Sequence, residues 1–105
     1  MMPLPTRIVV LCRDVPASGP LRVAAMAQHF AHIEAMLAEI DVAGPLYDAG
    51  GSRMIGSLFC LRTASAERAR QLVEGDPYFK AGVWQSIEYL PFLPAAGEYV
   101  GGKTW

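Results

Sequence analysis

The sequence has almost no excess of charge, since nine Lys and Arg residues face ten Asp and Glu residues and give a formal net charge of −1 over 105 residues. No basic stripe or Lys/Arg block occurs, which argues against a nucleic-acid partner. No apolar run approaches the roughly 20 residues that span a bilayer. Residues 1–5 lack the charged start and long apolar region of a signal peptide. We therefore expect a cytoplasmic protein that binds neither nucleic acid nor membrane.

Cysteine is also scarce. Cys12 and Cys60 are the only two, and they stand alone inside apolar runs without the CxxC spacing of a zinc or redox site. They are expected to be buried thiols. His29 and His32 lie three residues apart, but no third metal ligand is evident near them. Phosphate-binding and dinucleotide-binding glycine loops are missing. The sequence thus indicates no metal and no cofactor.

What the chain does have is enough apolar material for a core, at 52% hydrophobic and 18% charged residues. We expect one domain over residues 1–94 and a Gly-rich C-terminal tail over residues 95–105, either mobile or laid over a neighbouring surface. Apolar and β-branched runs predict four strands, and 3.6-residue periodicity with a Ser65 cap predicts two helices. The strands are expected at 7–13, 43–47, 53–62 and 83–92, and the helices at about 21–40 and 65–74. This βαββαβ order predicts an α+β, ferredoxin-like fold with a four-stranded antiparallel sheet.

Two apolar patterns predict how these elements pack. The first helix carries an apolar stripe that is expected to face the sheet, formed by Val23, Met26, Phe30, Ile33, Leu37 and Ile40. The strand at 53–62 is apolar on both faces, whereas a sheet with one wet face should alternate. The sheet face away from the helices therefore needs cover. We expect a homodimer in which this face packs against the same face of a second copy.

Histidine and aspartate are the candidates for chemistry. At about 100° per residue, His29 falls at the edge of the expected apolar stripe, about 70° from its centre, while His32 points mainly to solvent. Histidine titrates near neutral pH and works best as an acid or base when a carboxylate orients its ring. Asp76, which opens the turn Asp76-Pro77, could supply that carboxylate, but it also fits the structural role of a helix cap. Spacing alone leaves both interpretations open.

Several residues are candidates for substrate binding. Arg22 and Arg13 could hold a carboxylate or phenolate, or could simply be solvated. Ser57 could donate a hydrogen bond to a ligand, although no nucleophile motif surrounds it. Three aromatic residues around the Asp76 turn could line an apolar pocket or belong to the core. They are Tyr78, Phe79 and Trp84.

Three stretches of the sequence resemble the YciI-like family of the dimeric α+β barrel superfamily. They are residues 29–36 (HFAHIEAM), the AGPL and GSL segments at 43–46 and 56–58, and residues 76–84 (DPYFKAGVW). The resemblance covers about residues 7–93. It implies a ferredoxin-like dimer, similar in architecture to muconolactone isomerase, with a His–Asp active site formed here by His29 and Asp76. The arginine that the family often carries three residues before the histidine is replaced by Met26, and Arg22 lies one turn away.

We therefore expect a small cofactor-free enzyme with a small-molecule substrate. His29 would move a proton on a cyclic or enol-type compound, such as a lactone or a hydroxylated aromatic, and Asp76 would orient His29 and stabilise its charged form. Isomerisation or elimination of a small acid such as HCl fits this pair. The alternative is a non-catalytic module that binds a small ligand on the same dimeric scaffold.

Overall fold

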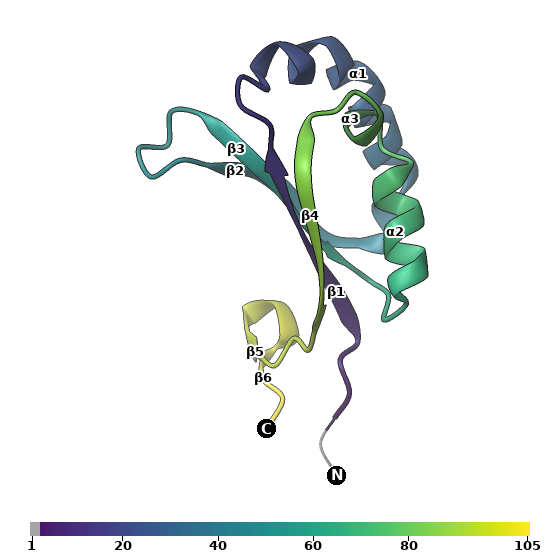
Figure 1. The fold of residues 1–105 in the computed structure, drawn as a ribbon. Helices are drawn as coiled ribbons and strands as arrows, with labels where there is room; N and C mark the ends of the chain where they lie inside the picture. The colour runs from purple at the N-terminus through teal and green to yellow at the C-terminus, as the bar shows by residue number, and fades with distance from the viewer. Residues whose placement is uncertain (1–2) are drawn as a thin grey trace.

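The fold is a four-stranded antiparallel sheet covered on one face by three helices, in a computed structural model that describes residues 3–105 (Figure 1). The sheet order is β2-β3-β1-β4, and the two central strands are β1 and β3. The strands are β1 (Arg7–Asp14), β2 (Ile40–Tyr47), β3 (Met54–Leu61) and β4 (Trp84–Phe92). The helices are α1 (Gly19–Ala35), α2 (Ala66–Glu74) and the short α3 (Pro77–Lys80). The predicted ferredoxin-like βαββαβ arrangement is confirmed.

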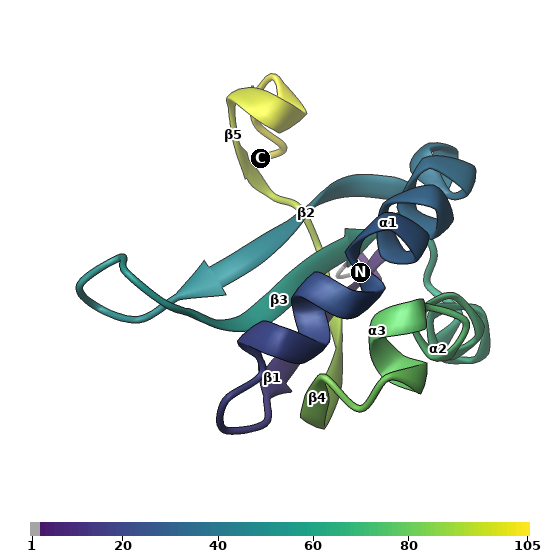
Figure 2. The same ribbon diagram turned by 90° about the horizontal axis from the view of Figure 1, so that it is seen from above.

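The core lies between the sheet and the helices. Alternate residues of β1 point into it, and Ile8, Val10 and Cys12 are each at most 2% exposed. From above, α1 crosses the sheet while α2 and α3 lie beside each other (Figure 2). Helix α2 begins as predicted, because the Ser65 side chain accepts a hydrogen bond from the Arg68 N–H. Its inward residues are also those expected from the sequence, namely Ala69, Leu72 and Val73.

The first helix differs from its prediction in length and in orientation. It ends at Ala35, a 3-10 turn η1 (Leu37–Glu39) follows, and β2 already begins at Ile40. The predicted apolar stripe is not the buried face, since Val23 is 70% exposed and Phe30 is 53% exposed. The buried residues of α1 are instead Arg22 and Ala25. The helix is rotated toward the sheet on its arginine side, because Arg22 finds hydrogen-bond partners there that offset the cost of burying its charge.

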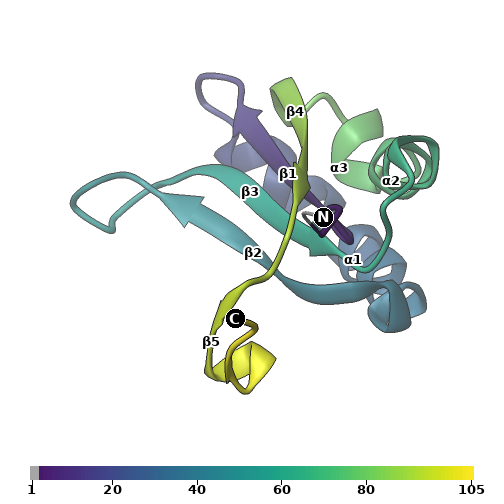
Figure 3. The ribbon, with the colours of Figure 1, turned by 90° about the horizontal axis from the view of Figure 1, so that it is seen from below.

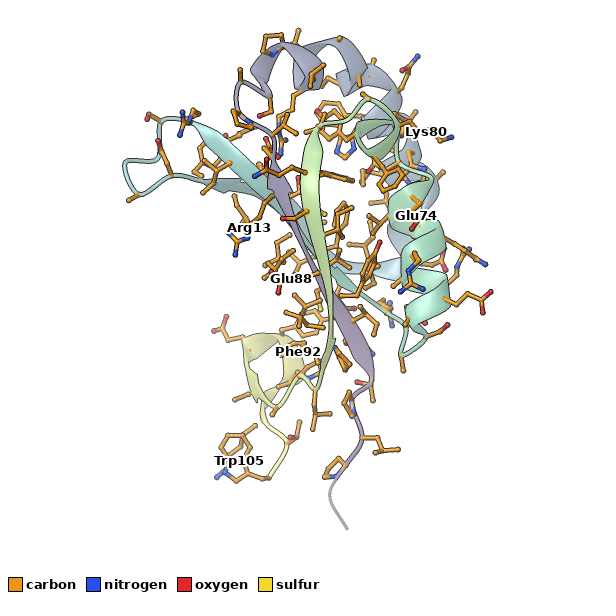
Figure 4. All side chains as sticks on the ribbon, in the orientation of Figure 1. Arg13, Glu74, Lys80, Glu88, Phe92 and Trp105 are labelled. Atoms are coloured by element: carbon orange, nitrogen blue, oxygen red, sulfur yellow. The ribbon has the colours of Figure 1, made fainter. Side chains whose placement is uncertain are left out.

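The sheet face away from the helices, called the outer face below, is apolar. Val42 is 60% exposed, Leu90 is 42% exposed and Phe92 is 43% exposed on this side. Arg13 and Glu88 also point away from the helix layer, whereas Glu74 and Lys80 lie on it (Figure 4). Both faces of the sheet are therefore rich in apolar residues, as the pattern of residues 53–62 predicted.

The C-terminal residues form a small hairpin beside the outer face. It comprises β5 (Ala96–Gly97), a 3-10 turn η2 (Glu98–Val100) and β6 (Gly102–Lys103), and it extends from the end of β4 away from α2 and α3 (Figure 3). Tyr99 reaches the carboxylate of Asp41, which also binds Arg7. The tail is thus laid over a neighbouring surface. None of the helices formed by residues 3–105 has the length and apolar character needed to cross a membrane.

Candidate functional site

His29 and Asp76, which are 47 residues apart in the sequence, are directly hydrogen-bonded. His29 Nδ1 lies 2.8 Å from Asp76 Oδ1 and 2.9 Å from Oδ2. The histidine comes from the middle of α1, and the aspartate from the turn that opens α3. The side chain of Asp76 is 1% exposed and that of His29 is 13% exposed. A carboxylate buried this deeply requires donors, and His29 is one of them.

The local sequence explains how Asp76 reaches this position. Asp76 is the N-cap of α3, with extended backbone angles, and Pro77 occupies the first helical position where no N–H is needed. The Tyr78 N–H donates to Asp76 Oδ1 at 2.8 Å. Asp76 therefore has both of the roles considered from the sequence, because the same carboxylate caps α3 and forms a hydrogen bond with His29.

This arrangement gives the two ring nitrogens of His29 different hydrogen-bonding roles. Because Asp76 accepts hydrogen bonds, Nδ1 is assigned as the nitrogen that carries the proton. Nε2 is then the acceptor. Among the described residues, no hydrogen-bond partner occupies Nε2, and the His29 side chain lines an open groove. An imidazole with its far nitrogen held by a carboxylate and its near nitrogen free is suited to accept a proton.

The groove has a volume of about 1050 Å³ and lies between α1, the β1–α1 loop and the β2–β3 hairpin. Its wall is mainly apolar. Four residues of α1 that were expected in the core contribute to it, namely Val23, Met26, Phe30 and Ile33. The polar or ionisable groups among its lining include His29, Arg22, Ser57 and Tyr78. An apolar wall with a few convergent polar groups is typical of a small-molecule site.

Arg22 is a buried member of this site, with 9% of its side chain exposed. It forms a two-pronged ion pair with Asp14, with distances of 2.7 Å from Nε and 3.0 Å from Nη2. Nη2 also donates to the Gly56 carbonyl at 2.8 Å and to Ser57 Oγ at 3.0 Å. Burial by itself would lower the pKa of Arg22, but the hydrogen bond and charge of Asp14 raise that pKa above its usual value. Among the described residues, Nη1 has the sulfur of Met54 at 3.6 Å, and the Tyr78 hydroxyl also forms a hydrogen bond with the guanidinium.

Tyr78 supports the histidine from within the protein. Its ring is stacked on the His29 ring with centroids 3.8 Å apart and planes 5° apart. The residue is 4% exposed, and burial raises the pKa of its hydroxyl. Trp84 contacts the Tyr78 ring edge-on at 6.1 Å. Trp84 is itself buried and is not part of the groove lining, so it lies behind Tyr78.

The remaining candidates lie elsewhere. Phe79 is 40% exposed and does not line the groove. Arg13 points away from the helix layer, on the opposite side of the sheet from α1, the helix that carries His29 (Figure 4). The expectation that His32 points to solvent is wrong, because its Nε2 lies 2.8 Å from the Leu72 carbonyl oxygen and joins α1 to α2.

Sequence reasoning missed Asp14 and Ser18, which complete the arginine cluster. Ser18 Oγ donates to Asp14 Oδ2 at 2.6 Å, and that same oxygen accepts from Arg22. The sequence feature that could have indicated this cluster is an aspartate at the end of the first strand, followed by a serine four residues later and an arginine eight residues later. Such a spacing crosses a loop of unknown shape, so it did not predict contact by itself.

Comparisons with known proteins agree with the fold and place the chain in a family. The family model of the YCII-related domain matches residues 6–93, so the chain belongs to the YCII-related family. In a search of solved structures, the chain is similar to 5-chloro-2-hydroxyhydroquinone dehydrochlorinase (TftG) from Burkholderia phenoliruptrix AC1100, in complex with 2,5-dihydroxybenzoquinone. The two are 28% identical with a TM-score of 0.75, and the match covers 89% of this chain and 97% of TftG.

A second structure, At3g17210 from Arabidopsis thaliana, is 10% identical with a TM-score of 0.46, covering 90% of this chain and 98% of that one. No curated protein gives a significant match.

Proposed function

We propose that this protein is a cofactor-independent enzyme that catalyses proton transfer on a small hydroxylated ring compound. The observation that carries the proposal is the His29–Asp76 hydrogen bond at the wall of an apolar groove. His29 Nε2 takes a proton from the substrate and returns it to another atom. Asp76 holds the ring and stabilises the imidazolium that forms. A positioned acid–base group of this kind contributes typically about 10²–10⁴-fold in rate.

Arg22 is proposed to bind the oxyanion that develops on the substrate. Its Nη2 and Nε already bind protein oxygens, whereas Nη1 has a weak thioether partner in Met54. A guanidinium donor with a weak partner can form a charge-assisted hydrogen bond to a phenolate. Ser57 and Asp14 hold the guanidinium in place for that contact.

The apolar lining of the groove and the similarity to TftG support a proposal for the substrate class. TftG acts on 5-chloro-2-hydroxyhydroquinone and holds 2,5-dihydroxybenzoquinone. A flat ring with several hydroxyl groups suits an apolar wall that carries the basic nitrogen of His29 and the guanidinium of Arg22. We therefore propose elimination of HCl from a chlorinated hydroxyhydroquinone. Isomerisation of a related ring would need the same proton transfer without loss of chloride.

The proposed elimination takes place in two steps. His29 moves a proton from a hydroxyl group to the ring carbon that carries chlorine, which gives the keto tautomer. A second hydroxyl group then loses its proton, its oxygen becomes a carbonyl, and the electrons pass through the ring as the C–Cl bond breaks. Chloride leaves with the electron pair of that bond. The net change is loss of HCl and formation of a hydroxyquinone, so no external oxidant is needed.

We also propose that the protein is a homodimer joined through the outer faces of its sheets. The exposed apolar residues Val42, Leu90 and Phe92 would be covered by the same residues of a second copy. Arg13 and Glu88 on this face carry opposite charges, so a two-fold arrangement can bring unlike charges together (Figure 4).

The test of the catalytic proposal compares His29→Asn and Asp76→Asn with the parent protein on 5-chloro-2-hydroxyhydroquinone, followed by chloride release. We expect a loss of about 10²-fold or more in each variant, because one removes the base and the other removes the charge that stabilises it. His32→Asn is the matched control, since it makes the same change on the same helix outside the groove. Chloride release by His29→Asn at the parent rate would refute the proposal.

A second measurement separates the alternative function. Binding of 2,5-dihydroxybenzoquinone is measured by calorimetry for the parent and for Arg22→Met. Binding without any chloride release by the parent protein would favour the small-ligand-binding module over the enzyme.

A further inference from the structure

We infer that Tyr78 is a positioning residue that holds both members of the His29–Asp76 pair. Its ring stacks on the imidazole of His29, and its backbone N–H donates to the carboxylate of Asp76. The inference rests on the proposed function, because positioning matters only if the pair transfers protons. It assigns to Tyr78 a task different from contact with the substrate.

The stack supplies a constraint that the hydrogen bond lacks. The bond from Nδ1 to Asp76 fixes one atom of the imidazole, but the ring can still tilt about that contact. A second ring 3.8 Å away and within 5° of parallel fixes the plane of the imidazole. The position of Nε2, the atom that would meet the substrate, depends on that plane. Misplacement of a reacting group by about 1 Å can cost about 10²-fold in rate.

Tyr78 can act as a rigid support because it is itself immobilised. Only 4% of the residue is exposed. Trp84 packs edge-on against its ring with planes at 85°, and the Arg22 guanidinium carbon lies 5.2 Å from its ring centroid. Pro77 fixes the backbone just before it at the start of α3. The ring is therefore held by Trp84 and Arg22, and its backbone by Pro77, before the substrate arrives.

The aromatic face also favours the charged state of the histidine. When His29 accepts a proton it becomes a cation lying over a π face, and such contacts are attractive. The stabilisation comes from the ring and not from the hydroxyl group. Phenylalanine should therefore keep the support of His29, although it loses the hydrogen bond of the Tyr78 hydroxyl to Arg22, whereas an aliphatic residue of similar size should not keep that support.

The experiment compares Tyr78→Phe, Tyr78→Leu and Tyr78→Met, with Phe79→Leu as the control at the neighbouring, partly exposed aromatic position. The first readout is the NMR signal of the His29 ring protons, which a stacked aromatic ring shifts upfield. We expect the upfield shift in the parent, in Tyr78→Phe and in Phe79→Leu, and its loss in the Leu and Met variants. This readout needs no substrate.

The second readout is kcat and KM on 5-chloro-2-hydroxyhydroquinone. We expect kcat to fall by about 10–100-fold in the Leu and Met variants, with KM changed little, and to be restored in Tyr78→Phe. Methionine adapts to irregular space in a core. If Tyr78→Leu does not fold, the kcat of Tyr78→Met therefore tests the inference in its place.

Two outcomes would overturn the inference about Tyr78 and leave the proposed function intact. One is an unchanged His29 ring signal in the Leu or Met variant, which would mean that the rings are not stacked. The other is a parent-like kcat in a folded Leu or Met variant while His29→Asn is inactive. Full activity of His29→Asn is a different result, because it removes the proposed function itself.

Discussion

At the scale of the residue, three buried carboxylates differ only in what binds them. The side chains of Asp76, Asp14 and Asp41 are 1%, 4% and 2% exposed. Asp14 is held by Arg22 and Asp41 by Arg7, and a guanidinium keeps its proton at any ordinary pH. Asp76 is held by an imidazole, whose two ring nitrogens allow it both to accept and to donate a proton. Of the three pairs, only the one with His29 can therefore take part in proton transfer.

Asp41 gives a prediction for the dependence of stability on pH. Burial by itself would raise the pKa of Asp41, but the hydrogen bonds from Tyr99 and Arg7 and the charges of Arg7 and Arg62 lower it below the ordinary value of 3.8. A carboxyl group whose folded pKa is lowered contributes stability above its unfolded pKa, and this is lost as the pH falls through the folded value. The contribution should be complete at neutral pH and decline below about pH 4.

The measurement is urea unfolding of the parent and Asp41→Asn between pH 7 and pH 3. We expect the variant to be less stable at pH 7 and the difference to shrink as the solution becomes more acidic, because the parent then loses the ionised carboxylate too. Glu34→Gln, at an exposed carboxylate of α1, is the control. A difference between parent and Asp41→Asn that stays constant over this range would contradict the assignment.

At the scale of the element, the close approach of β1 and β3 depends on Gly56. A Cβ atom at this position would lie 2.3 Å from the Cys12 carbonyl oxygen, which is backbone and cannot turn aside. Gly56 also offers its own carbonyl to Arg22. The strand pairing and the position of the buried arginine therefore both require this glycine.

Gly56→Ala should destabilise the protein by about 1–3 kcal/mol, because the added methyl group forces the two central strands apart. Gly44→Ala is the matched control in the neighbouring strand, where an added Cβ meets no atom of residues 3–105 within 4 Å. Thermal unfolding of both variants measures the effect. Equal melting temperatures for the two variants would show that the strands yield without cost.

The elements differ in how far the sequence could predict them. The Ser65 cap and the Asp76 turn are local features, and the structure has them where they were expected, whereas β2 begins at Ile40, three residues before its expected start. The orientation of α1 was not predictable from periodicity, because it depends on a partner for Arg22 that another element supplies. The contact between His29 and Asp76 was expected from the family resemblance. Spacing could not establish it, since 47 residues separate the two.

At the scale of the whole molecule, the outer face of the sheet predicts assembly. Leu90→Glu places a charge among exposed apolar residues of β4 and should shift the proposed dimer to monomer, because an unpaired charge is costly to bury. Sedimentation at micromolar concentration measures the change. Leu37→Glu, at a residue that is 60% exposed in η1 and outside the sheet, should leave the assembly unchanged. A parent protein that sediments as a monomer would contradict the dimer.

The burial of Asp76 limits how the His29–Asp76 pair exchanges hydrogen isotopes with water. Since this carboxylate is 1% exposed and Nδ1 is bonded to it, the pair exchanges protons with its surroundings through Nε2 alone. In the proposed reaction, a hydrogen removed from the substrate stays at that nitrogen until the product or entering water takes it. For an isomerisation in which His29 takes hydrogen from carbon, a substrate deuterated at that carbon would therefore record, in the deuterium retained by the product, how often water reaches the groove during one turnover.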